Sequence, residues 1–434
     1  MHDVLNLREM LHDEIVERRE SGHLVTEPDP AAVQAADDTE LRQLIAAVEA
    51  SPMRSEWPYE EPDALEAIVA AGPPAPPRAT LQLDTPALRD RLHAAWLGRC
   101  AGCTLGKPVE NWPRAEIARY LRERDSYPLR GYISADEPPG NGFPAFHPSW
   151  ADSVAGRIDG SPRDDDTDYT VLATLVLEAH GPAFGPDDVA AEWLRRLPFM
   201  AVYTAERAAY RNLIAGHRPP RTATLINPYR EWIGAQIRVD AYGYASPGDP
   251  ERAAAMAFAD ASLSHTSNGI YGAMWAAALI AAAFAETTMR SALDSALAVV
   301  PAQSRLSEAL RGVLALHEQG LDWEAARDVL EVRHGDLSPV HTINNAAVVS
   351  AALLWGEGDF ARTVSLAVQG GWDTDCNGAT AGSAFGAMHG VAALSADWIA
   401  PLDDRLRTGL FGVGELRISE LVERSLALAT SVDG

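Results

Sequence analysis

Lysine is almost missing from this chain of 434 residues: Lys107 is the only one, and arginine supplies the other strongly basic side chains. The bias is typical of a GC-rich bacterial genome, and no function follows from it alone. Acidic residues outnumber basic ones by 61 to 36, which gives a formal net charge of −25. A surface with this excess of negative charge repels phosphate backbones and acidic lipids. We therefore expect neither nucleic acid nor a membrane as a partner.

Cysteines and membrane-spanning runs are scarce as well. Three cysteines cannot all pair, so we interpret them as reduced thiols of a cytoplasmic protein. The N-terminal segment 1–9 is charged and lacks the apolar run of a signal peptide. The longest apolar stretch, residues 270–285, is shorter than the roughly 20 residues of a bilayer span, and it predicts a buried core helix.

What the chain does contain is enough apolar material for a large core, since 47% of its residues are hydrophobic. The Pro-rich segment 71–77 predicts a linker, which divides a helical N-terminal appendage (1–83) from a main domain (84–434). No segment alternates apolar and polar residues convincingly over the length of a strand, so the sequence predicts an all-α protein. Helical patterns in the main domain cover residues 87–103, 169–179, 187–197, 203–215, 250–285, 302–319, 323–332 and 342–355.

The first helix of the main domain carries Gly98, Gly102 and Gly106 at four-residue spacing. Glycine costs about 1 kcal/mol per helical position relative to alanine. A row of glycines therefore predicts close approach of another helix or of a ligand.

Two acidic turns stand in front of apolar helices. Asp373 and Asp375 lie in a glycine-rich turn, where they either cap the following helix or bind Mg²⁺ or Mn²⁺. The run Asp164, Asp165 and Asp166 precedes a second helix, and it is either a solvated cap or part of the same site. If the turns meet, with Glu110 beside them, like charges would destabilise the fold unless cations intervene. Two divalent ions about 3.5–4 Å apart would account for so many acids.

The cysteines support a rival interpretation. Cys100 and Cys103 form a C-x-x-C pair, and Cys376 follows the second acidic turn, so a three-thiolate zinc site or a redox pair is an alternative. Two buried thiols in a helix rich in small residues explain the same spacing.

Three stretches in this order resemble the signatures of the ADP-ribosylglycohydrolase family, which includes the dinitrogenase reductase-activating glycohydrolase. They are Gly-Arg-Cys-Ala-Gly-Cys-Thr-Leu-Gly-Lys-Pro-Val-Glu at 98–110, Asp-Asp-Asp-Thr at 164–167 and Gly-Trp-Asp-Thr-Asp at 371–375. Stretches 233–238, 264–269 and 341–346 also resemble the family. The resemblance covers about residues 85–390.

The resemblance implies an all-α orthogonal helical bundle with a dinuclear metal cleft that holds two Mg²⁺ or Mn²⁺ ions. It also implies a hydrolase that cleaves a glycosidic bond at the anomeric carbon of ribose in ADP-ribosyl conjugates, on a small molecule or a modified protein. Glu110 would contact one metal and a ribose hydroxyl or the attacking water. The implied metal ligands are Asp164, Asp165, Asp166, Asp373 and Asp375.

Further residues are candidates for substrate binding. Gly234, Gln236 and Arg238 resemble a loop that meets phosphate or the distal ribose, although a structural salt bridge of Arg238 with Asp240 is an alternative. The other two candidates, His265 and Asn268, either line the cleft or cap the helix that follows.

Departures from the family pattern suggest a distinct subgroup with a smaller substrate. Cys103 replaces a common Asp, Cys376 replaces a common Thr, and Asp164 adds a charge. Trp372 is inserted beside the acids, where it is suited to stack on a base or a similar ring. A nucleoside or nucleotide N-ribosidase is therefore an alternative, and a non-catalytic binding or structural protein on the same scaffold is a less favoured one.

Overall fold

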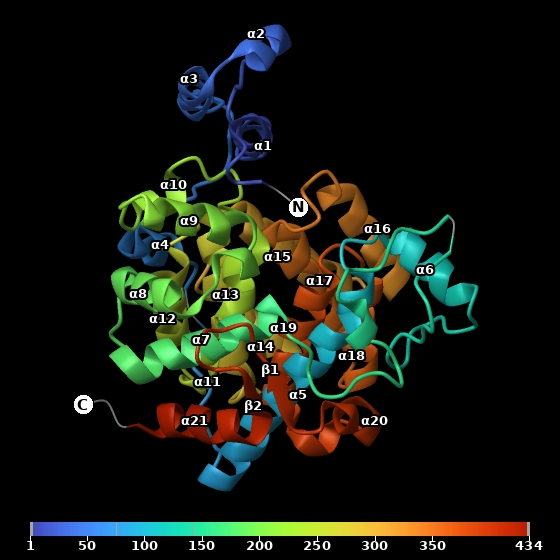
Figure 1. Ribbon diagram of the computed structural model, residues 1–434. Helices are drawn as coiled ribbons and strands as arrows, with labels where there is room; N and C mark the ends of the chain where they lie inside the picture. The colour runs from blue at the N-terminus through green and yellow to red at the C-terminus, as the bar shows by residue number, and fades with distance from the viewer. Residues whose placement is uncertain (1–2, 75, 141, 432–434) are drawn as a thin grey trace.

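The computed structural model describes residues 3–74, 76–140 and 142–431, and helices make up most of it (Figure 1). The predicted all-α class is confirmed. In the described residues, the only strands are β1 (Arg405–Arg407) and β2 (Glu415–Arg417), which pair antiparallel with Leu406 opposite Leu416. No helix in the described part of the chain is long and apolar enough to cross a membrane.

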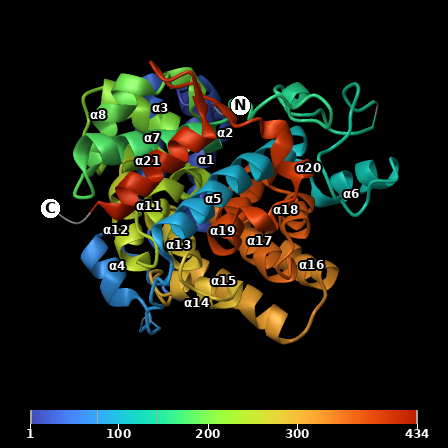
Figure 2. The same ribbon diagram turned by 90° about the horizontal axis from the view of Figure 1, so that it is seen from below.

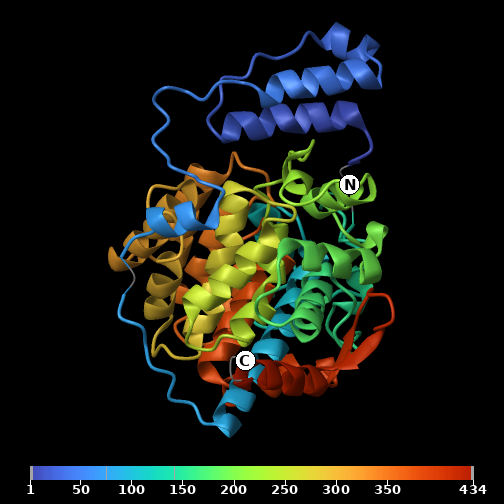
Figure 3. The same ribbon diagram turned by 90° about the vertical axis from the view of Figure 1, so that its left-hand side faces the viewer.

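The N-terminal helices α1 (Leu7–Glu20), α2 (Pro30–Ala35) and α3 (Asp38–Glu49) lie on top of the remaining helices (Figure 1). The apolar faces of α1 and α3 pack together and also against Ala205, Ala208 and Tyr229. The chain then passes through α4 (Leu65–Ala71) and runs down the side of the molecule, as Figure 3 shows. The division at residue 83 stays a prediction.

The other helices form one continuous core around α5 (Thr85–Gly106), α13 (Ser267–Ala283), α17 (Thr342–Trp355) and α19 (Thr374–His389), which are buried along most of their length. Figure 2 shows α5 beside α19. Around these helices lie α6 (Arg114–Arg122), α7 (Asp165–His180), α8 (Pro186–Arg196), α9 (Thr204–Ile214), α10 (Arg221–Thr224), α11 (Asp240–Tyr244), α12 (Pro250–Ala261), α14 (Met289–Leu297), α15 (Arg305–Glu318), α16 (Trp323–His334), α18 (Phe360–Gln369), α20 (Ala396–Ile399) and α21 (Ile418–Thr430). Short 3₁₀ turns link them, among them η1 (Lys107–Val109) and η4 (Ile233–Arg238).

One expected helix is divided. Residues 250–285 form two helices, α12 and α13, separated by a turn in which Thr266 N donates a hydrogen bond to Arg230 O at 3.1 Å. Side-chain contacts hold the same turn, because Arg238 donates to Ser264 Oγ at 2.9 Å. These partners lie far away along the chain, so helical periodicity alone does not reveal the break.

Candidate active site

The predicted row of glycines is a contact between backbones. Helices α5 and α19 run antiparallel, with Gly98 opposite Gly382 and Gly102 opposite Gly378. A methyl group on Gly102 would lie 1.9 Å from the carbonyl oxygen of Gly378, a distance that no packing allows. The same approach sets Gly106, at the end of α5, against the first turn of α19. It therefore brings the turn after α5 next to Asp375.

The other acidic turn joins α5 through a buried arginine. Asp164 is the N-cap of α7 and accepts a hydrogen bond from Asp166 N at 3.1 Å. Arg99, on α5, donates to the carbonyl oxygen of Asp166 at 2.7 Å and pairs with Asp240 at 2.7 Å. The first turn of α7 is thus fixed against α5, and the acidic turns that are distant in sequence do meet.

The loop before α19 is held in an uncommon backbone conformation. Gly371 and Trp372 both have positive φ, at +76° and +64°, which is rare for a tryptophan. Asn345, on α17, accepts hydrogen bonds from Asp373 N at 3.1 Å and from Asn377 Nδ2 at 2.8 Å. The buried side-chain amide of Asn345 thus orients both Asp373 and the start of α19. No local sequence pattern predicted this role.

Six carboxylates form what we call the acidic cluster: Glu110, Asp164, Asp165, Asp166, Asp373 and Asp375. Lys107 reaches into the cluster from the turn after α5. Its Nζ lies 2.9 Å from Glu110 Oε2 and 2.7 Å from Asp164 Oδ2, and it also forms an ion pair with Asp375 Oδ2. The single lysine of the chain thus connects all three segments that supply the acids.

Several carboxylate oxygens of the cluster are free to bind a ligand. Asp166 Oδ2, Asp373 Oδ1 and Asp375 Oδ1 are buried and have no hydrogen-bond partner among the described residues. Buried charges of this kind are costly unless a partner satisfies them. Two groups of residues offer potential ligand atoms that, within each group, all lie within 4.8 Å of one another. The first group is Cys103, Asp164, Asp166 and Asp375, and the second is Asp373, Asp375 and Cys376, so Asp375 belongs to both. Oxygen-rich groups with open atoms fit a divalent cation.

The zinc and redox alternatives lose their support. All three cysteines are free and buried. Cys103 and Cys376 belong to different groups, and Cys100 belongs to neither group within the described residues. Burial raises the pKa of Cys100 to about 11, so this thiol stays protonated at neutral pH.

Burial and crowding set the protonation of the acids. Burial raises the pKa of Asp166 and Asp373 well above its ordinary value, and the nearby charge of Asp375 raises it further. The same two causes raise the pKa of Glu110 to about 7. Burial is also the largest effect on Asp375 and acts in the same direction, but the charge and hydrogen bond of Lys107 together with a hydrogen bond from Asp373 leave the pKa of Asp375 below its ordinary value. Protons or cations are therefore needed to neutralise the cluster.

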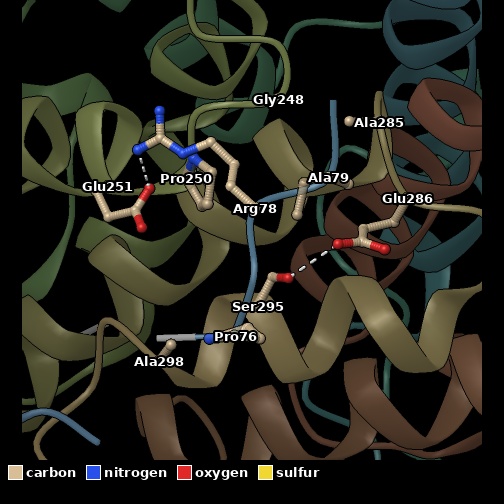
Figure 4. A pocket seen from close by; sticks show the side chains of 11 residues that line it. Pro76, Arg78, Ala79, Gly248, Pro250, Glu251, Ala285, Glu286, Ser295 and Ala298 are labelled. Carbon is tan, nitrogen blue, oxygen red and sulfur yellow. Dashed lines mark hydrogen bonds and ion pairs between the residues drawn. The ribbon is translucent and has the colours of Figure 1, made fainter. Parts of the chain in front are cut away.

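A cavity of about 410 Å³ opens over the cluster. Glu110, Asp165, Asp373, Asp375 and Lys107 form its charged floor. Its wall is largely apolar and contains Tyr203, Trp232, Ile233, Ile237 and Val340; the remaining lining residues are Asn111, His147, Thr204, Glu206, Gly234, Ser338, Pro339 and Cys376. By contrast, the hollow between the linker and α12 that Figure 4 shows has only about 20 Å³, room for little more than one water.

Comparisons with known proteins identify the fold. A family model described as ADP-ribosylglycohydrolase matches residues 84–432. The chain belongs to the ADP-ribosylglycohydrolase family. This membership supports glycohydrolase activity. A solved chain described as "ADP-ribosylglycohydrolase-related protein complex" is 20% identical with a TM-score of 0.50, over 79% of this chain and 98% of that one, which supports the shared fold. A comparison with curated proteins found no match.

The structure places the predicted acids and the predicted substrate contacts differently. Four of the six acids, Glu110, Asp165, Asp373 and Asp375, line the cavity, and so does Gly234, beside Glu206. Arg238 instead pairs with Asp260 and, at 2.6 Å, with Glu206, and Asp240 pairs with Arg99 rather than with Arg238. The lining of the cavity does not include Arg238, Gln236, His265, Asn268 or Trp372.

The contacts of those remaining residues explain their positions. Gln236 Oε1 accepts a hydrogen bond from Thr342 at 2.7 Å, and His265 Nδ1 lies 2.8 Å from Ser264 Oγ. Asn268 Oδ1 accepts from Leu306 N at 3.0 Å. The ring of Trp372 lies under the guanidinium of Arg327, 3.9 Å from its carbon, rather than facing the cavity. Sequence reasoning in turn missed His147 and Trp232, which no motif marks.

Proposed function

We propose that this protein is a divalent-cation-dependent hydrolase that cleaves the bond between the anomeric carbon of ribose and a nitrogen or oxygen. Its substrate would be an ADP-ribosyl conjugate or a related ribosyl compound. The observation that carries the proposal is the acidic cluster itself: carboxylates from three separate segments meet at the floor of a cavity, and three of their oxygens have no partner in the described structure.

Asp164, Asp165, Asp166, Asp373 and Asp375 would hold the metal, as Mg²⁺ or Mn²⁺. When bound, such an ion lowers the pKa of a coordinated water and offsets negative charge. The remaining negative charge of the carboxylates favours the positive charge that develops at the anomeric carbon when the glycosidic bond breaks.

Glu110 is the proposed proton acceptor. Its carboxylate lines the cavity, where Lys107 Nζ donates to Oε2 at 2.9 Å and Asn111 Nδ2 donates to Oε1 at 3.3 Å. These two contacts fix the orientation of the carboxylate. It would accept the proton of the water that attacks the anomeric carbon.

A nucleoside N-ribosidase is the second candidate, and the cavity favours a small, uncharged substrate. Among the described lining residues Lys107 is the only Lys or Arg, and three carboxylates already bind it. A diphosphate is usually recognised by arginines or by a helix N-terminus with free amides. The apolar wall with Tyr203 and Trp232 is better suited to a base than to a phosphate.

A substrate panel tests both candidates. ADP-ribosyl-arginine, an ADP-ribosylated peptide, free nucleosides and nucleotides are incubated with the enzyme, with Mg²⁺, Mn²⁺ or EDTA, and released ribose or ADP-ribose is measured. We expect metal-dependent release that both D373N and E110Q abolish. Release that survives both substitutions and chelation would contradict the proposed mechanism, and the substrate hydrolysed decides between the two candidates.

A further inference from the structure

The two groups of potential metal ligands are not equivalent. Lys107 Nζ contacts Asp164 and Asp375, which are two of the four members of the first group, together with Cys103 and Asp166. Within the described residues of the second group, Lys107 contacts the shared residue Asp375 alone, through Oδ2. A positive charge is therefore already present at one of the two places.

Two of the three free oxygens belong to the second group. Asp375 gives Oδ2 to Lys107 and keeps Oδ1 free, and Asp373 Oδ1 is also without a partner in the described structure, whereas the third free oxygen, Asp166 Oδ2, belongs to the first group. Asp375 thus has the arrangement of a bridging carboxylate, with an ammonium on one oxygen and an open position at the other. In a two-metal site, a bridging carboxylate has a metal ion on each oxygen.

The ammonium is firmly held in this place. Lys107 is 5% exposed, and three carboxylates surround it. Moving it out of the cluster would remove its hydrogen bond to Glu110 and its ion pair with Asp164, and would leave these buried carboxylates without a positive partner. A second divalent ion at the first group would have to displace it against that cost.

We propose that Lys107 replaces the second metal ion, so that the centre binds one divalent cation, at Asp373 and Asp375, and one ammonium. This inference rests on the proposed metal dependence and differs from the two ions that the family resemblance implies. Lys107 is then a positioning residue: it holds Asp164, Asp375 and Glu110 in place and supplies a fixed charge that chelators cannot remove.

Metal stoichiometry tests the proposal. The full-length protein is equilibrated with excess Mn²⁺, freed of unbound metal and analysed for manganese per chain and by electron paramagnetic resonance. We expect one Mn²⁺ per chain with the spectrum of an isolated ion. For K107M we expect two per chain and the spectrum of a coupled pair. R290M removes a positive charge paired with Asp294 and Glu318, and it should keep the wild-type value.

The results separate this inference from the proposed function. Two ions in the wild-type protein would overturn the role of Lys107 and leave metal dependence intact, whereas no bound ion would overturn both. An unchanged count of one in folded K107M would also overturn it, because removal of the ammonium would then open no second site.

A second measurement needs no variant. Because the chain has one lysine, labelling with ε-¹⁵N lysine gives a single side-chain ammonium signal in the whole protein. We expect this signal to shift on saturation with Mg²⁺ and to keep slowly exchanging protons. Rapid exchange with water after Mg²⁺ is added would mean that the metal displaces Lys107, which contradicts the proposal. This experiment decides the question if K107M does not fold.

Discussion

Two of the buried clusters of charge in the described structure differ in the cations that they contain. The acidic cluster has six carboxylates and one lysine. The second, which we call the interface cluster, consists of Glu14, Glu17, Glu61, Glu231, Arg230 and Arg305 and joins α1 to the helices beneath it. There, Arg230 binds Glu14 through two hydrogen bonds of 2.8 and 3.0 Å, and Arg305 binds Glu61 at 2.8 Å and Glu231 at 2.7 Å.

The charges of the interface cluster stabilise the structure, whereas the acidic cluster keeps open positions for a ligand. Planar guanidinium groups match carboxylates with two parallel hydrogen bonds, so the arginines satisfy most of the interface cluster. Burial acts to raise the pKa of Glu231, but Arg305, His341 and Arg230 together lower it to about 2. In the acidic cluster the pKa of Asp166 and Asp373 rises instead, because burial and the nearby charge of Asp375 favour the protonated forms.

The largest effect is expected in the acidic cluster. Because Glu110 would accept the proton of the attacking water, E110Q should lower kcat/KM by about 10³-fold, within the range of general-base contributions. The measurement is steady-state hydrolysis of whichever substrate the panel identifies. E116Q, which alters a partly exposed glutamate on α6, is the matched control and should retain full activity. Equal activity of E110Q and E116Q would refute the assigned role.

Breaking the interface cluster should cost stability and not metal binding. R230M leaves Glu14 and Glu17 buried without their main cation, which typically costs about 3–5 kcal/mol. Denaturant unfolding measures the loss, and R89M, which breaks an exposed pair with Glu423, should cost less than about 1 kcal/mol. Manganese per chain should stay the same in both variants. A smaller loss in R230M than in R89M would show that the buried pairing does not stabilise the fold.

Divalent cations should stabilise the protein through the acidic cluster alone. A metal at about 100 times its dissociation constant adds about 2.7 kcal/mol to the free energy of unfolding. Thermal unfolding with and without Mn²⁺ should therefore show a clear rise in Tm for the wild type and for D328N, a substitution at an exposed aspartate. The rise should vanish in D373N. A rise of the same size in D373N would place the metal elsewhere.

The last prediction concerns pH and Glu17, the poorly paired glutamate of the interface cluster. Burial raises the pKa of Glu17 from 4.5 to about 8, so the folded chain keeps a proton there that the unfolded chain loses. The stability from this proton is present below pH 4.5 and is lost as the pH rises through about 8. The slope is at most about 1.4 kcal/mol per pH unit.

Urea unfolding between pH 5 and 9 checks this expectation. The difference in stability between the wild type and E17Q should change steadily over that range, in favour of E17Q at high pH. A constant difference would mean that Glu17 is already ionised in the folded protein at pH 5.

Sequence patterns predicted the helices well, because helices depend on local signals. Apolar periodicity acts over a few residues and correctly indicated an all-α chain. That the two acidic turns meet was stated only as a condition, because their contact depends on the tertiary structure. The glycine spacing of α5 even predicted a close partner, although not which one. That partner is α19, which only the tertiary structure reveals.

Contacts between residues that are distant in the chain lay beyond the reach of these local patterns. Arg238 matches a loop that meets phosphate, yet Asp260 and Glu206 bind its guanidinium, and neither lies near it in sequence. Trp372 stands beside the acids, but its positive φ and Arg327 place the ring away from the cavity. The lone lysine was read as a mark of genome composition, whereas its three partners at positions 110, 164 and 375 give it a place in the site.

The contact between α5 and α19 also determines which parts of the site can move. Gly98 and Gly102 touch the backbone of the opposite helix, so the two helices cannot slide or tilt without collision. Glu110, Lys107 and Asp375 are therefore carried by one rigid unit. Any widening of the cavity must come from its opposite wall, residues 203–206, 232–237 and 338–340. Part of that wall, at Trp232, packs against the N-terminal helices. We therefore expect motions of the N-terminal appendage to change the shape of the substrate cavity more than the positions of the metal-binding acids.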